Sequence, residues 1–167
     1  MKNLILIVFL IPVIGFSQNK QLAMFDNLIG KTWKADGNWN NGSEFKQEKT
    51  FEYSLNSTIV IVNTIGFIDQ ERTKLGKRNY GIRQYDKKSG TIKFWEFDVF
   101  GGLTTGIVFT KGRNLFYQYE YAGSQITNMW EFVNDTTYNF KVGIWKNETW
   151  EKLLLDTQFI ALNKNYR

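Results

Sequence analysis

The side chains of this sequence that could take part in chemistry are carboxylates, lysines and tyrosines, because the chain contains no histidine and no cysteine. This excludes Ser-His and Cys-His nucleophilic pairs and the common zinc sites. Glu96 and Asp98 fall on one face of a predicted strand, and paired carboxylates can hydrolyse glycosidic bonds. They alternate with Trp95 and Phe97, so we predict that both carboxylates face solvent. We therefore expect no catalysis, no cofactor and no metal site.

A second group of polar side chains falls on strand faces that we predict to be buried. Gln47 and Lys49, for example, share one strand face with the aromatic residues Phe45, Phe51 and Tyr53. Buried polar groups need partners and a buried lysine is costly, so such side chains either form a network or face a ligand. We predict a small-molecule site in the interior that the sheet encloses, lined by Gln47, Lys49, Gln84, Trp95, Tyr117, Tyr119, Asn128 and Trp130.

Two alternatives remain open for these side chains. The aromatic residues can simply form the core, with Lys49 reaching solvent at a rim. A register shift of one residue would also turn every one of these side chains to the opposite face. A cavity of about 300 Å³ or more between Lys49, Tyr117 and Trp130 would favour the ligand site, whereas a filled interior would favour the core.

The segment that organises these residues runs from Thr91 to Tyr121. Aromatic and β-branched side chains fall at every second position in it, and glycine-bearing turns at 101–102 and 111–114 divide it into successive strands. This pattern is typical of an antiparallel meander. Further strands are expected over 32–39, 43–53, 58–63, 78–85, 125–132, 138–145 and 148–162.

About ten strands at hairpin spacing leave no room for crossover helices, so the fold class is all-β. We predict an antiparallel up-and-down barrel over residues 31–162, because closure removes exposed strand edges. A two-sheet sandwich is the alternative. Residues 64–77 form the longest irregular stretch, and a loop of this length can gate an opening.

The two ends of the chain are expected to lie outside the barrel. Residues 1–17 combine a short basic start, an apolar run and small residues before Gln18, which predicts a cleaved signal peptide and an exported protein, periplasmic or secreted. A retained membrane anchor is the alternative, although the run is too short to span a bilayer comfortably. Residues 18–30 predict a short amphipathic helix that closes the barrel, and residues 163–167 a polar tail.

The charge distribution excludes some partners. The net charge is +5, with both signs scattered along the chain, so we expect no nucleic-acid binding. After signal cleavage no stable membrane insertion is expected. The sequence does not indicate which oligomeric state the protein adopts.

The segment Leu28-Ile29-Gly30-Lys31-Thr32-Trp33, opening a meander of about ten strands, resembles the start of calycin-superfamily barrels. It looks most like the lipocalin-like bacterial barrels of unknown function. The Tyr85-Asp86 step before a Ser-Gly turn and the glycines at 101, 102 and 106 are also similar to those families. The resemblance implies that Trp33 closes one end of the barrel.

These features predict an exported lipocalin-like protein that binds a small apolar molecule in the barrel lumen without catalysis. One alternative is a carbohydrate- or surface-binding adhesion module that uses Trp39, Trp145 and Trp150 as a stacking platform. Another alternative is an enzyme based on carboxylates, lysines or tyrosines.

Overall fold

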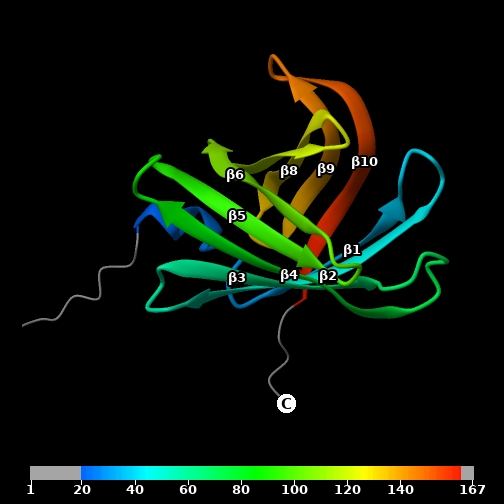
Figure 1. The fold of residues 1–167 in the computed structure, drawn as a ribbon, viewed down its shortest axis with the longest axis horizontal. Helices are drawn as coiled ribbons and strands as arrows, with labels where there is room; N and C mark the ends of the chain where they lie inside the picture. The colour runs from blue at the N-terminus through cyan, green and yellow to red at the C-terminus, as the bar shows by residue number, and fades with distance from the viewer. Residues whose placement is uncertain (1–19, 163–167) are drawn as a thin grey trace, which may run out of the picture.

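The computed structural model describes residues 20–162. The predicted signal peptide and polar tail lie outside the described residues, so both stay predictions. Within the described range the chain forms ten strands and one short helix (Figure 1). No helix in this range is long and apolar enough to cross a membrane.

The ten strands form a closed antiparallel barrel, in which each strand pairs with the next along the chain and β1 also pairs with β10. The strands are β1 Thr32–Asn38, β2 Glu44–Ser54, β3 Ile59–Phe67, β4 Leu75–Asp86, β5 Thr91–Asp98, β6 Leu103–Lys111, β7 Asn114–Tyr121, β8 Ser124–Asn134, β9 Thr137–Lys146 and β10 Thr149–Leu162. This topology confirms the predicted all-β up-and-down barrel and excludes the two-sheet sandwich.

Tight turns fix which side chains face the interior. Between β6 and β7, Lys111 pairs directly with Asn114, and Gly112 in the turn has a φ of 60°, which glycine adopts without steric cost. Side chains of directly paired residues project to the same face. Val108 and Tyr117 are such a pair, and both are buried inside the barrel.

The faces of β4 and β5 are the reverse of our prediction. Arg83 and Glu96 line the interior, whereas Gln84 and Trp95 lie on the outer face, where Gln84 is exposed and Trp95 half-buried. The prediction was wrong because it assigned the aromatic alternation to the interior. On β5 the outer face carries Trp95 and Phe97, the latter at 47% exposure, whereas the inner face carries the charged Glu96 beside the buried Phe94.

The segment before β1 packs against one end of the barrel. It forms a 3-10 helix, η1 Lys20–Phe25, instead of the amphipathic helix predicted over residues 18–30. Leu22, Phe25 and Leu28 recur at every third residue, the repeat of a 3-10 helix, and all three are fully buried. The indole Nε1 of Trp33 donates a hydrogen bond to the carbonyl oxygen of Leu28 at 3.1 Å, which joins this segment to β1.

Near η1 the barrel interior is filled by aromatic rings. Trp33, fully buried, packs edge-on against Tyr138, with 5.3 Å between ring centroids, and against Trp130 at 6.3 Å. Trp130 stacks on Phe159 at 4.4 Å. These rings form a rigid floor, beyond which the interior is hollow.

Candidate ligand-binding site

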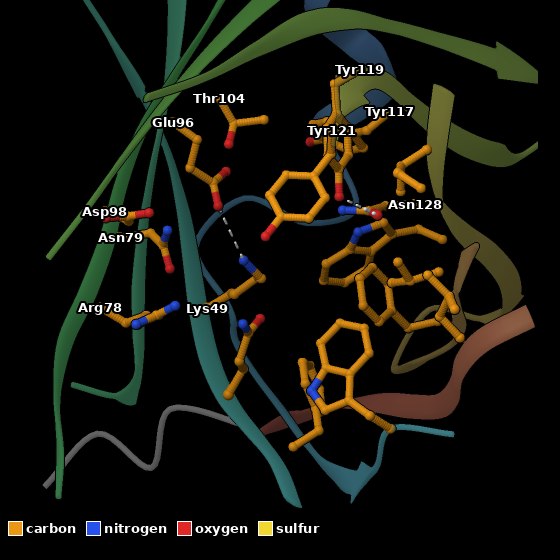
Figure 2. A pocket seen from close by; sticks show the side chains of 18 of the residues that line it. Lys49, Arg78, Asn79, Glu96, Asp98, Thr104, Tyr117, Tyr119, Tyr121 and Asn128 are labelled. Carbon is orange, nitrogen blue, oxygen red and sulfur yellow. Dashed lines mark hydrogen bonds and ion pairs between the residues drawn. The ribbon is translucent and has the colours of Figure 1, made fainter. Parts of the chain in front are cut away.

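A cavity of about 570 Å³ occupies the half of the barrel that lies farther from η1 (Figure 2). It lies between Lys49, Tyr117 and Trp130, which favours a ligand site there over a filled core. Trp39, which follows β1, and Arg72, in the loop after β3, reach its mouth. Sites for drug-sized ligands usually span about 300–1,000 Å³, so this volume suits a small molecule.

The cavity has a charged wall, which also carries Phe51 and Phe94, and an apolar wall, which carries no charged side chain among the described residues. Strands β2, β4 and β5 form the charged wall with Lys49, Arg83 and Glu96. Strands β8 and β9 contribute Trp130 and Phe140 to the apolar wall. In Figure 2 the labelled side chains of β4 and β5 lie on one side of the cavity and Asn128 of β8 on the other.

Three charged side chains form the centre of the charged wall. Arg83 Nη2 lies 2.7 Å from Glu96 Oε2. Lys49 Nζ lies 4.0 Å from Glu96 Oε1 (Figure 2). Lys49 Nζ also donates a hydrogen bond to Thr64 Oγ1 at 2.9 Å. Because Lys49 and Arg83 are only 8% and 3% exposed, two buried cations share one carboxylate.

Arg83 lies flat against the barrel wall over a glycine. A Cβ atom at Gly81 would stand 1.9 Å from Arg83 Nη1, so the guanidinium occupies the space of a side chain at that position. Arg83 Nε donates a hydrogen bond to the Tyr117 hydroxyl at 3.4 Å. Nη1 is buried and has no hydrogen-bond partner within residues 20–162. The guanidinium is therefore held in place but not fully satisfied.

Burial and charge act against each other in this cluster. Burial lowers the pKa of Lys49, although the negative charge of Glu96 opposes this shift. Burial would raise the pKa of Glu96, but the charges of Lys49 and Arg83 outweigh it and hold that pKa below its ordinary value. Glu96 is therefore ionised at neutral pH. When Lys49 is protonated, the cluster carries one net positive charge.

Tyrosines of β7 supply neutral polar groups beside the cluster. Burial raises the pKa of Tyr119 to about 12, and that of Tyr117 also lies above its ordinary value because of burial. The Tyr119 hydroxyl donates a hydrogen bond to Asn128 Oδ1 at 3.2 Å. Both phenols therefore stay protonated at neutral pH and give the cavity neutral hydroxyl groups.

Two arginines stand at the mouth of the cavity. The Arg78 guanidinium lies over the Phe100 ring, with 4.4 Å from Cζ to the ring centroid, and Arg72 donates a hydrogen bond to the backbone oxygen of Glu44. Among the described residues, neither arginine forms an ion pair within 4.0 Å. A second hollow of about 440 Å³ adjoins the mouth and is lined in part by the loop between β3 and β4.

The structure brings together most of the side chains that the sequence indicated as a site. The cavity is lined by Gln47, Lys49, Tyr117, Tyr119, Asn128 and Trp130. Gln84 and Trp95 do not line it, because they point outward from β4 and β5. Sequence reasoning missed Arg83 and placed Glu96 in solvent. The turn lengths contained the signal for both, since directly paired residues must share a face.

The carboxylates Glu96 and Asp98 line the cavity instead of facing solvent, which corrects our prediction. Glu96 is paired with Arg83, and Asp98 Oδ1 accepts hydrogen bonds from the amides of Phe100 and Gly102, at 2.8 and 2.9 Å, in the turn after β5. Both carboxylates thus have structural partners. Within residues 20–162 no group of three metal-ligating side chains comes together.

Of the tryptophans suggested as a stacking platform, Trp39 lies apart from Trp145 and Trp150, which are directly paired between β9 and β10. Trp39 lines the cavity mouth and packs edge-on against Phe45 at 5.7 Å. Trp145 lies on the outer face, where it packs against Phe116 at 4.9 Å, below the ammonium of Lys111. Trp39 thus belongs to the mouth of the cavity, whereas Trp145 packs on the outside of the barrel.

No model of a known protein family matches the chain, and no curated protein sequence matches it.

Proposed function

We propose that this protein binds a small, predominantly apolar molecule in the barrel interior and does not transform it. The observation that carries the proposal is the cavity of about 570 Å³ between Lys49, Tyr117 and Trp130. The floor of aromatic rings next to η1 gives the cavity a closed end, and the mouth gives it an entrance. A binding role without chemistry fits the two carboxylates of the wall, which are both held by structural partners.

We also propose kinship with the calycin superfamily, closest to its lipocalin-like bacterial members. The ten-stranded closed barrel, the helical segment before β1 and the buried Trp33 next to that segment support this kinship. Export to the periplasm or the medium is part of the proposal and rests on the first 17 residues of the sequence.

A pair of variants on β6 tests the binding site. Thr104 points into the cavity, and Thr105, the next residue, points to the outer face. We expect the wild-type protein to bind the neutral fluorescent probe phenylnaphthylamine. Thr104→Trp should weaken this binding by about tenfold or more because the indole fills part of the cavity, whereas Thr105→Trp should leave it nearly unchanged.

Equal binding by both variants would place the probe outside the barrel and contradict the proposal. The natural ligand can be sought independently by native mass spectrometry of the protein purified from its own compartment. A retained mass that is present with Thr105→Trp and lost with Thr104→Trp would identify a ligand of the cavity.

A further inference from the structure

We propose that the ligand of this cavity is an organic anion, with its negative group at Lys49 and its apolar body against Trp130 and Phe140. The inference rests on the ligand-binding function proposed above and adds the chemical class and the orientation of the ligand.

The cavity wall carries more positive than negative charge. Its cations are Lys49, Arg72, Arg78 and Arg83, and its anions are Glu96 and Asp98. Both anions are already engaged, Glu96 by Arg83 and Asp98 by two backbone amides. An anion that enters the cavity therefore meets an excess of positive charge. A cation of the same size would meet repulsion.

Lys49 has donors left for such an anion. Its ammonium group carries three N–H donors. Thr64 Oγ1 accepts one of them at 2.9 Å, and Glu96 Oε1, at 4.0 Å, is too far away for a hydrogen bond. Lys49 lines the cavity, so the remaining donors can reach a ligand oxygen.

Arg83 adds a buried hydrogen-bond donor that the described part of the chain leaves unsatisfied. Its buried Nη1 has no partner among the described residues, and an unsatisfied buried donor on a charged group is costly. The negative charge of a ligand at Lys49 would act on Arg83 through a medium of low polarity, where charges interact strongly. The free donors of Lys49 and the unsatisfied donor of Arg83 therefore both favour an anionic ligand.

The two walls fix the orientation of the ligand. Lys49 and Arg83 lie on β2 and β4, whereas Trp130 and Phe140 lie on β8 and β9. A molecule with an anionic group and an apolar body can satisfy both walls at once. A wholly apolar molecule would leave Lys49 without a partner for its free donors.

A matched pair of probes tests this inference. Anilinonaphthalene sulfonate and phenylnaphthylamine share one apolar body, and only the first carries a negative charge. We expect the wild-type protein to bind the sulfonate more tightly, and added KCl to weaken the sulfonate alone. Lys49→Met should lower the affinity for the sulfonate by about tenfold and leave that for the neutral probe nearly unchanged. Lys34→Met, on the outer face of β1, is the control and should change neither.

Each outcome decides a different question. If the two probes bind equally and Lys49→Met weakens both alike, the anionic ligand is refuted while the cavity stays a binding site. If neither probe responds to Thr104→Trp, the proposed function itself fails. If Lys49→Met does not fold, as judged by near-UV circular dichroism, Arg78→Gln at the mouth takes its place. An unchanged ratio of the two affinities in Arg78→Gln would then overturn the inference.

Discussion

Glu96 is the carboxylate shared by Lys49 and Arg83, so its removal should destabilise the fold more than removal of Lys49. In Glu96→Gln both cations, 8% and 3% exposed, lose their countercharge. Breaking a buried ion pair by removing one partner costs about 3–5 kcal/mol. Because the Glu96 side chain keeps 20% exposure, we expect about 3 kcal/mol, the lower end of that range.

Lys49→Met should behave differently. It leaves Arg83 and Glu96 as a balanced pair at 2.7 Å and removes a charge whose burial is unfavourable. The loss of the hydrogen bond to Thr64 costs about 1 kcal/mol. We therefore expect the free energy of unfolding of the variant to lie within about 1 kcal/mol of the wild-type value, or to exceed it.

Urea denaturation at pH 7, followed by tryptophan fluorescence, measures these differences without adding salt. With a denaturant slope of about 2 kcal/mol per M, Glu96→Gln should lower the unfolding midpoint by about 1.5 M. Glu48→Gln, which breaks a surface ion pair with Lys34, is the control and should cost less than about 1 kcal/mol. Equal losses for Glu96→Gln and Lys49→Met, or a larger loss for Lys49→Met, would refute the uncompensated-charge reasoning.

Three further predictions follow from other contacts and from the N-terminal sequence. Gly106→Ala should destabilise the fold by about 3 kcal/mol or more, because a Cβ there would lie 2.0 Å from a backbone oxygen, whereas a Cβ at Gly37 would meet only the Thr157 side chain, at 3.1 Å, so Gly37→Ala should cost less in the same urea assay. The folded-state pKa of Glu96 lies below its ordinary value of 4.5, so its stabilising contribution is complete above that pH and is lost as the pH falls through the folded-state pKa. The stability gap between wild type and Glu96→Gln should therefore shrink in acid, and a gap that is constant from pH 7 to about pH 3 would contradict this. Intact mass of the exported protein should correspond to a chain that begins at Gln18, and a full-length mass in the exported fraction would disprove signal cleavage.

Alternation and turn chemistry were sufficient to predict the barrel from the sequence. The meander from Thr91 to Tyr121 becomes β5, β6 and β7, with turns where the glycines stand. The interior side chains of β7 and β8, among them Tyr117 and Trp130, were also placed correctly. On these strands the inner face is rich in aromatic side chains, so apolar periodicity and the direction of the interior coincide.

The same reasoning failed on β4 and β5, because on these strands the face with the apolar periodicity does not face the interior. The turn at Gly112 pairs Lys111 with Asn114, so an inward Tyr117 requires an inward Val108 on β6. Carried on across the sheet, this register turns Glu96 inward and Trp95 outward. The length of this turn thus predicts which face of β4 and β5 lines the interior, whereas hydrophobicity alone predicts the opposite face. The 3-10 form of η1 was missed because a repeat of three and a repeat of 3.6 differ little over six residues.

The charged wall is the part of the barrel that stability alone does not explain. An apolar side chain in place of Lys49 would line the cavity together with Phe51 and Phe94 and bury no charge, and the Arg83–Glu96 pair would remain complete. Conflicts between a local feature and the stability of the fold are expected at functional sites. If Lys49→Met proves stable but loses its preference for the anionic probe, the lysine serves the ligand. If it unfolds readily, Lys49 instead stabilises the barrel through Thr64, and the charge excess of the cavity has a structural cause.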